Sequence, residues 1–454
     1  MISRLRRAGV FAGVAALAVV APLLGDAAVV PFLAVAAVAF FGIRDGEWFT
    51  TLALPGDEDD DRLYGLVAFA FAGAGLALFA SIPRAPLPYE AFAAAMLAVG
   101  GGRLGRELIG QRTRAEFPLV AGYVAVGGAL ALGGQLVVQA ALPAAAGLHV
   151  VTGAEPPVAV DSSVPLLVFL AAVASLTAAF VRSLVFARDA HITTVFVAFA
   201  VWGFIALEPA VSTPLIVFGL AVTGALGYIS YALGTASVPG MLTGVLLALF
   251  AVVLGGVGWF LTLMSFYAVG GLASKYRFDE KAARGVAQEN EGARGTGNVL
   301  ANSAVALIAV VGFAATGHID VSPALFGFAF AGAIATAMAD TLSSEIGGLY
   351  DGPRLITTLQ PVEPGTDGAV TWQGEVAGLT GALVVGALAA VGMPLGDPVA
   401  GGGVVILAGV VGMTVDSLLG ALIEGERVGN QAVNFLATVA GAGVAVALGV
   451  GVVG

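Results

Sequence analysis

The chain has 454 residues, of which 59% are hydrophobic and 11% are charged, and its formal net charge is −11. A soluble domain carries about 25% charged residues, so the composition excludes a protein whose surface faces mainly water. The absence of cysteine excludes disulfides and thiol chemistry. We therefore predict an all-α polytopic protein of the cell membrane whose helices face lipid, and we expect no nucleic-acid partner.

Apolar segments of the length that a bilayer requires predict about fifteen transmembrane helices. The first follows the basic residues at the start of the chain, and we interpret it as a membrane helix because further apolar segments, and no soluble domain, follow it. The predicted helices are 9–24, 27–43, 63–82, 88–102, 117–140, 164–181, 192–208, 214–231, 240–255, 257–273, 299–317, 322–339, 375–393, 398–420 and 431–453.

The basic residues predict the orientation of these helices. With a cytoplasmic N-terminus and alternating helices, 18 of the 19 Lys and Arg residues fall in cytoplasmic connections, and only Arg84 falls outside. This distribution follows the positive-inside rule. It also predicts that the polar segments 274–298, 340–374 and 421–430 share one cytoplasmic face.

The chain is expected to divide into an N-terminal membrane region, 1–190, and a second membrane domain, 191–454. Residues 92–110 resemble 266–285, and 169–189 resemble 328–347 in the same order. One hypothesis is that residues 1–190 are a degenerate duplicate of the second domain. Arginine outnumbers lysine by 17 to 2, and acids cluster in loops such as 56–61. This composition predicts a salt-rich cytoplasm, as in an archaeal halophile.

Both lysines of the chain, Lys275 and Lys281, lie in the cytoplasmic segment 274–298 together with Arg294. Lysine is a mobile point charge suited to phosphate, and nearby glycines would expose backbone N–H groups to an anion. The alternative interpretation is ordinary loop charge on the cytoplasmic side. Asn298 and Asn302, four residues apart, extend the polar face into the next helix.

Two acidic clusters follow in segments predicted to reach the same face. Asp340 and Glu345 lie in ADTLSSEIGGLYDG, and Asp416 interrupts the apolar run GMTVDSLLGALIEGE. Carboxylates of this kind suit Mg²⁺, which is usually held by one or two of them together with substrate phosphates. The alternatives are a solvated helix end for Asp340 and a structural ion pair or hydrogen bond for Asp416. Between the clusters, Gly365 and Thr366 lie in a turn-forming loop that is predicted to cover the site or to be a plain connection.

These stretches resemble a known family. SK-x(5)-K, VLANS, ADTLSSEIG, EPGTDGAV and VDSLLGA are similar, in this order, to motifs of the domain-of-unknown-function 92 membrane family. The family includes transmembrane protein 19 and the chloroplast phytyl-phosphate kinase, and is distantly related to phytol and dolichol kinases and to CTP-dependent phosphatidate cytidylyltransferases. The resemblance covers about 195–454. This chain departs from the family pattern in the turn loop, which reads GTDGAVT, and at Ser344, where alanine is common.

The resemblance implies a phosphotransferase that moves a phosphoryl group from CTP, or another nucleoside triphosphate, to an isoprenoid monophosphate from the bilayer. The acceptor would be geranylgeranyl or phytyl phosphate, the product its diphosphate and the cofactor Mg²⁺. The implied catalytic residues are Lys275, Lys281, Asp340 and Asp416. The implied nucleotide- and phosphate-binding residues are Lys275, Lys281, Arg294, Asn298, Asn302, Gly365 and Thr366, and the implied metal ligands are Asp340, Glu345 and Asp416.

Two other functions stay open on the sequence. A transporter of an anionic or lipidic substrate also contains repeats and charges within the membrane. Polar residues crowded at one face, not at the midplane, favour an enzyme over a transporter. A non-catalytic membrane scaffold is the third possibility, but it does not explain why both lysines lie in one loop.

Overall fold

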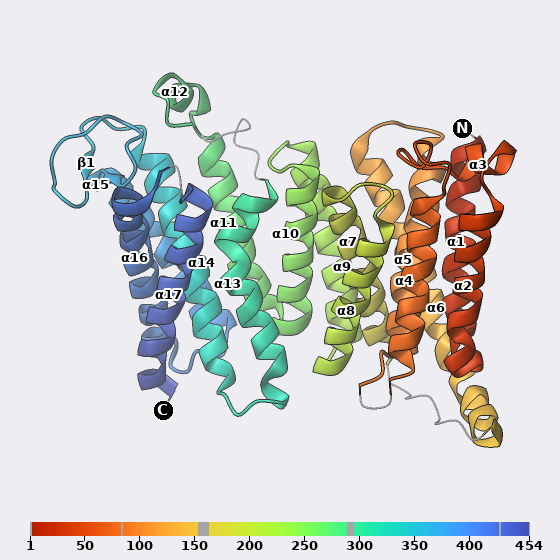
Figure 1. Ribbon diagram of the computed structural model, residues 1–454. Coiled ribbons are helices and arrows are strands. Elements are labelled where there is room, and N and C mark those ends of the chain that lie inside the picture. Colours follow the sequence, from red (N-terminus) through yellow and green to blue (C-terminus); the bar gives the residue numbers. More distant parts are fainter. Residues whose placement is uncertain (1, 83–84, 153–162, 288–294, 426–427, 454) are drawn as a thin grey trace. The chain divides into compact units, whose positions relative to one another are not determined.

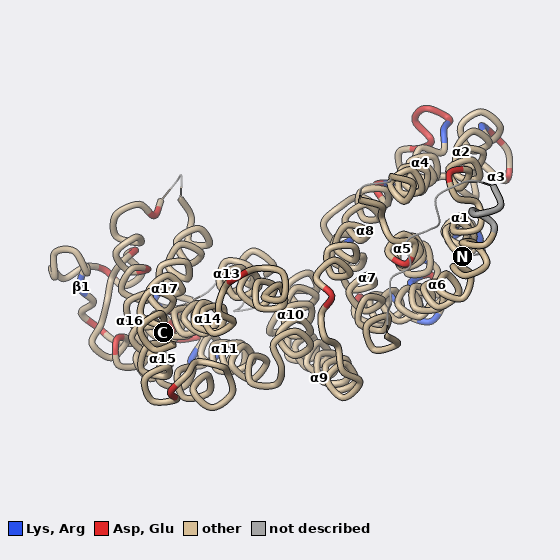
Figure 2. Tube along the Cα trace, turned by 90° about the horizontal axis from the view of Figure 1, so that it is seen from below, with Lys and Arg blue, Asp and Glu red and all other residues tan. Residues whose placement is uncertain are grey.

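The computed structural model describes all residues except 1, 83–84, 153–162, 288–294, 426–427 and 454. The described chain is built of helices, and the long connection 348–371 carries one pair of two-residue strands (Figure 1). Twelve helices among these residues are long and apolar enough to cross a membrane. The predicted fold class, an all-α polytopic membrane protein, is confirmed. Figure 2 shows that acidic and basic residues occupy only a small part of the trace.

Every helix predicted from the apolar pattern lies on a helix of the structure. The break predicted within 240–273 falls at Gly256, whose φ of +97° is disallowed for most other residues. The helix predicted to end at 339 continues to Gly347, so Asp340 lies inside a helix and not at its boundary. The number of membrane crossings and the cytoplasmic position of the N-terminus stay predictions.

The helices form two compact units, 1–212 and 213–454. The sequence placed the division after residue 190, whereas the helix from Ala190 to Leu207 packs with the N-terminal unit. The hypothesis that the N-terminal region is a degenerate copy stays a prediction. The α-helices of the N-terminal unit are α1 Ile2–Leu24, α2 Val29–Ala37, α3 Gly46–Leu52, α4 Tyr64–Ala80, α5 Tyr89–Gly110, α6 Glu116–Thr152, α7 Val164–Leu184 and α8 Ala190–Leu207. A short 3₁₀ helix, η1 Gly25–Ala28, precedes α2, and a π-helical segment, η2 Val38–Gly42, follows it.

Helix α5 is the centre of the N-terminal unit. It packs against α1, α6, α7 and α8, and every residue from Tyr89 to Gly102 is buried. Small residues allow this close approach. A Cβ atom added at Gly105 would lie 2.2 Å from the backbone oxygen of Gly122 on α6. The unit is therefore held together by packing of small residues around one helix.

The C-terminal unit carries the motifs that predict function. Its helices are α9 Thr213–Ala232, α10 Val238–Phe250, η3 Ala251–Gly255, α11 Val257–Lys275, α12 Phe278–Ala283, α13 Thr296–Ala314, η5 Ala315–Gly317, α14 Pro323–Gly347, α15 Trp372–Gly392, α16 Pro398–Ile423 and α17 Asn430–Val453. The strands β1 Arg354–Leu355 and β2 Ala369–Val370 pair antiparallel in the connection between α14 and α15.

Helix α14 is the central helix of this unit and packs against α11, α13, α15, α16 and α17. Glycines on its neighbours allow close approach to Thr336, because a Cβ atom added at Gly412 or Gly441 would lie 2.1 or 1.9 Å from the Thr336 hydroxyl oxygen. Strand β2 contacts both α14 and α16. The connection that carries β2 therefore lies against the two helices that bear the predicted carboxylates.

Candidate functional site

Lys281 lies on the short helix α12 and is fully buried. The chain reverses direction after α11, where Arg277 adopts a left-handed conformation with φ of +49°. This reversal directs Lys281 back to the end of α11. There its ammonium nitrogen donates to the backbone oxygens of Ala273 at 2.9 Å and Ser274 at 2.8 Å. A cation suits the carbonyl groups at a helix C-terminus, where the Ala273 oxygen also accepts from the Tyr276 backbone N–H at 3.1 Å.

The third partner of Lys281 is Glu345 in the last turns of α14. The ammonium group and Glu345 Oε2 form an ion pair, and both side chains are buried. An ammonium group has three N–H donors, so the two backbone oxygens and the carboxylate use all of them. Glu345 Oε1 is buried and makes no hydrogen bond to the described residues. One carboxylate oxygen is therefore left available for a donor or a cation.

Lys275 takes a different position although it is only six residues earlier. Its side chain is exposed, and its ammonium nitrogen donates to the backbone oxygen of Leu233 at 2.6 Å, just after α9. This single contact leaves two N–H donors without a protein acceptor among the described residues. The two lysines therefore differ: Lys281 is buried and all its N–H donors have partners, whereas Lys275 is exposed and keeps free donors.

Asp340 on α14 and Asp416 on α16 lie side by side, close enough for their carboxyl groups to interact directly. Both side chains are partly accessible. Each lies seven residues before the end of its helix, which is about 10 Å along the axis. The charge of Glu345 also acts on Asp340. The structure therefore pairs two of the three predicted metal ligands, Asp340 and Asp416, while Glu345 is held in its ion pair with Lys281.

Helix α17 adds an amide to this pair. With its side-chain nitrogen turned toward Asp416, Asn434 donates to Asp416 Oδ1 at 3.3 Å and to the backbone oxygen of Asn430 at 3.1 Å. Asn434 is buried. Its amide orientation follows from these two acceptors. One oxygen of Asp416 is thus fixed by a neighbour, which orients the carboxyl group.

A further acid lies just beyond α16. Glu424 acts electrostatically on both Asp340 and Asp416. Burial, and then the negative charge of Asp367, raise the pKa of Glu424, while a hydrogen bond with Asn430 lowers it. The sequence analysis did not select Glu424 or Asn434 as site residues, although an acid directly after an apolar span was a visible signal for Glu424.

The turn loop lies between the end of α12 and the end of α16. Gly365 and Gly368 have φ values of +85° and +74°. A Cβ atom added at Gly365 would lie 3.5 Å from Val286, and one added at Gly368 would lie 2.6 Å from the backbone oxygen of Ser417. The exposed Thr366 hydroxyl donates to the backbone oxygen of Glu363 at 2.7 Å. Thr366 therefore stabilises the turn in this structure.

Asn298 and Asn302 lie in the first turns of α13. The side-chain nitrogen of Asn302 donates to the backbone oxygen of Asn298 at 2.9 Å, and Asn302 is buried. This bond is internal to the helix. Arg294 lies outside the described residues. The predicted phosphate-binding roles of these three residues stay predictions.

Carboxylates from two helices are the groups in this site that suit a metal ion. No group of three or more His, Cys, Asp and Glu residues with metal-ligand geometry occurs in the described part of the chain. Mg²⁺ usually needs only one or two protein carboxylates, because water and substrate phosphates complete its octahedral shell. The Asp340–Asp416 pair and the free Glu345 Oε1 match that chemistry.

Comparison with known proteins identifies the family. Residues 221–442 match the family described as integral membrane protein DUF92. An uncharacterized membrane protein of Methanocaldococcus jannaschii is 36% identical over 196 residues, which are 41% of this chain and 74% of that protein. The chain belongs to this family of integral membrane proteins. The matched segment contains every predicted site residue.

Other relatives come from Synechocystis and Arabidopsis thaliana. An uncharacterized membrane protein of Synechocystis is 30% identical over 206 residues, 43% of this chain and 77% of that protein. The chloroplast protein VTE6 of Arabidopsis thaliana is 33% identical over 177 residues, 38% of this chain and 51% of VTE6. No solved structure matches the chain.

Proposed function

We propose that this protein is a prenyl-phosphate kinase of the cell membrane that uses CTP, or another nucleoside triphosphate, to convert an isoprenoid monophosphate to its diphosphate. Membership of the DUF92 family and the similarity to chloroplast VTE6 support this proposal, because the family it resembles includes the chloroplast phytyl-phosphate kinase. The proposed acceptor is geranylgeranyl or phytyl phosphate.

The observation that carries the proposal is the close approach of the Asp340 and Asp416 carboxyl groups on two helices that pack together, α14 and α16. Two carboxyl groups this close cannot both be ionised unless a cation lies with them, and an acid inside a membrane helix is costly without a partner. A magnesium ion with nucleotide phosphates supplies that positive charge and neutralises the charge that develops on the phosphates. Asp340 and Asp416 would hold it, and Glu345 Oε1, which has no hydrogen-bond partner among the described residues, is proposed to orient it or the acceptor.

The remaining residues are proposed to bind the nucleotide phosphates or to position other side chains of the site. Lys275 is exposed and has free donors, so its ammonium group is suited to a nucleotide phosphate. Lys281 holds the end of α11 and orients Glu345, and we assign it a positioning role. The loop with Gly365 and Gly368 lies against the end of α16, and in this proposal it covers the site.

The chemistry requires no covalent intermediate. An oxygen of the acceptor phosphate forms a bond to the γ-phosphorus, the bond between that phosphorus and its bridging oxygen breaks, and the nucleoside diphosphate leaves. The apolar tail of the acceptor stays in lipid while its phosphate meets the site at the helix ends. Catalysis then depends on positioning and on charge neutralisation.

The test uses the full chain purified into lipid nanodiscs. It is incubated with γ-labelled CTP, ATP, GTP or UTP, magnesium, and geranylgeranyl phosphate, phytyl phosphate or geranylgeraniol. We expect a labelled diphosphate that disappears with chelator and with Asp340→Asn or Asp416→Asn, but persists with Ser417→Ala, next to Asp416. No product with any nucleotide, together with solute uptake by liposomes that Asp416→Asn abolishes, would instead establish the transporter.

A further inference from the structure

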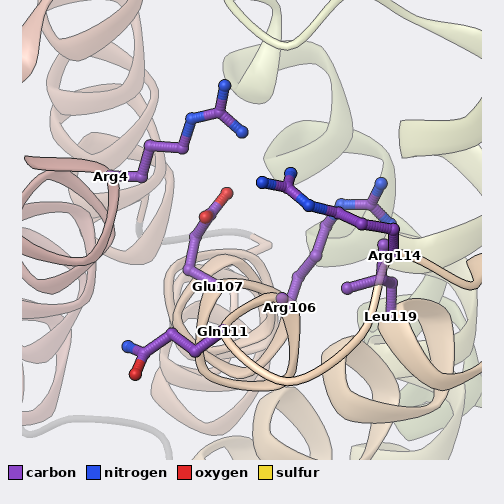
Figure 3. A pocket seen from close by; sticks show the side chains of 7 residues that line it. Arg4, Arg106, Glu107, Gln111, Arg114 and Leu119 are labelled. Atoms are coloured by element: carbon purple, nitrogen blue, oxygen red, sulfur yellow. The ribbon is translucent and has the colours of Figure 1, made fainter. Parts of the chain in front are cut away.

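A pocket of about 210 Å³ in the N-terminal unit is lined by three arginines that the proposed kinase site does not use. Arg4 comes from α1, Arg106 from α5 and Arg114 from the connection between α5 and α6. Figure 3 shows the three guanidinium groups around one space, with the carboxylate of Glu107 between Arg4 and the other two. Gln111 and Leu119 complete the wall.

The other arginines on the same helices have protein partners. On α1, Arg6 forms an ion pair with Glu47 at 3.1 Å, and Arg7 donates to the backbone oxygen of Ala53. On α5, Arg103 donates to the backbone oxygen of Ala187 and lies 4.2 Å from the centre of the Phe11 ring.

The three pocket arginines differ from these. Within the described residues, the side chains of Arg4, Arg106 and Arg114 make no hydrogen bond and no ion pair. Each planar guanidinium carries five N–H donors in a fork that matches two phosphate oxygens. The donors that line the pocket are therefore free to bind a ligand.

The charge in and around the pocket is strongly positive, although the chain as a whole carries −11. The lining contains three arginines and one acid, Glu107, so its net charge is +2. Around the lining, Arg182 on α7 repels Arg106 and Arg7 repels Arg4, while Glu116 attracts Arg106 as Glu107 does. Like charges held together without enough counter-charges raise the energy of the free protein, and an anion removes that cost.

We propose that this pocket is a binding site for a phosphate monoester or diphosphate group, separate from the kinase site. Its volume is smaller than the roughly 300–1,000 Å³ of pockets that enclose a drug-sized ligand, so it accommodates the phosphate group and leaves the rest of the ligand outside. The pocket lies where α1 begins, α5 ends and α6 begins. Such a position at the helix ends suits an anionic lipid head group, and it is equally open to a free polyphosphate.

The experiment measures binding of two probes to the full chain. Inorganic pyrophosphate is titrated calorimetrically against the protein in nanodiscs of phosphatidylcholine. Phosphatidate is incorporated in a second set of nanodiscs, and its retention is measured by native mass spectrometry. Saturable binding of pyrophosphate alone identifies a soluble ligand, and retention of phosphatidate identifies a lipid; either result supports the site if the variants below respond as expected.

Two pocket variants and one matched control locate the binding. Arg106→Gln and Arg114→Gln each remove charge-assisted hydrogen bonds, and we expect affinity to fall about ten- to a hundredfold. Arg6→Gln removes the same charge from α1 next to the pocket but loses only a pairing with Glu47, so affinity is expected to stay within about twofold. Glu107→Gln removes the carboxylate that repels an anion, and we expect tighter binding.

Three results would overturn the site. The first is an absence of saturable binding of both probes. The second is an equal loss of affinity in Arg6→Gln and Arg106→Gln, which would indicate only general attraction to a basic surface. The third is weaker binding in Glu107→Gln. Diphosphate formation by the C-terminal unit is measured in parallel, and failure of that activity leaves these binding results interpretable.

Discussion

Lys281 and Glu345 form a buried ion pair between α12 and α14, although 64 positions separate them in the chain. The same ammonium group closes the end of α11 through Ala273 and Ser274. One cation thus joins three helices at the end of the unit that holds the carboxylate pair. Lys281 was predicted from the sequence to be catalytic. Its contacts in the structure instead predict that it stabilises the fold, and mutants can test which role it has.

Replacing Lys281 with methionine is expected to destabilise the C-terminal unit by about 3–5 kcal/mol, because Glu345 is left as a buried charge without its partner. The measurement is thermal unfolding in detergent. Lys275→Met is the control, since its side chain is exposed. Adding Glu345→Leu to Lys281→Met should restore part of the loss. A normal melting temperature with lost kinase activity would show instead that Lys281 acts on phosphate.

Asp340→Asn and Asp416→Asn are each expected to reduce diphosphate formation about a hundredfold or more, because either change removes a charged ligand that positions the transferred group. The melting temperature should stay equal or rise slightly, since repulsion within the pair is relieved. Activity and unfolding are measured on the same preparation. Unfolding of both variants at a much lower temperature would mean that the pair is structural.

Glu424 is expected to make stability depend on pH. Burial raises its pKa in the folded chain above the value of 4.5 for an unperturbed glutamate. A raised pKa in the folded state favours the protonated form, so the contribution to stability is complete below pH 4.5 and is lost as pH rises through the folded pKa.

Glu424→Gln therefore should melt at a slightly higher temperature than the parent chain at neutral pH, and the difference should shrink toward pH 4. Parallel melting curves across this range test the sign. A Glu424→Gln variant that is less stable at neutral pH would show that the carboxylate is held by a cation or donor instead.

Gly368→Ala is expected to displace the turn loop. Its φ of +74° is strained for alanine by about 1–3 kcal/mol, and the new methyl group would lie 2.5 Å from the Ala421 side chain. Limited proteolysis of the loop 357–371 should accelerate, and kinase activity should fall. Gly365→Ala has the same kind of φ but room for a methyl group, so a smaller effect is expected.

Gly403→Ala serves as the control for this series. Gly403 lies within α16, and a Cβ atom there meets nothing within 4 Å. Alanine favours a helix over glycine by about 1 kcal/mol, so the variant should be as stable as the parent chain or more stable. Equal proteolysis of all three variants would contradict the role assigned to the close contact at Gly368.

The positions of the helices follow from the sequence because each apolar run is long enough to span a bilayer and ends at Gly, Pro or charge. The C-terminal end of α14, however, does not follow from the sequence. The polar run after 339 reads as a boundary, yet the helix continues to Gly347 because α15, α16 and α17 surround it and supply partners for polar side chains. Tertiary packing decides that boundary.

The sequence selects candidate site residues but not their contacts. Asp340, Glu345 and Asp416 were selected because acids within apolar segments are costly; the structure pairs Asp340 with Asp416, while Glu345 pairs with Lys281. The saturation of Lys281 was not visible in the sequence, since it depends on two backbone carbonyls brought back by the reversal at Arg277. Lys275 likewise finds its acceptor at Leu233, a contact that no local pattern encodes.

The pairing of Asp340 with Asp416 also has a consequence for biogenesis. During synthesis α14 emerges from the ribosome before α16, so Asp340 must enter the lipid without its companion carboxyl group. A lone aspartate at the centre of a helix costs about 2.5–3.5 kcal/mol on insertion scales, with a lower cost near its end. We therefore expect a chain truncated before α16 to hold α14 less stably in the bilayer than the full chain does.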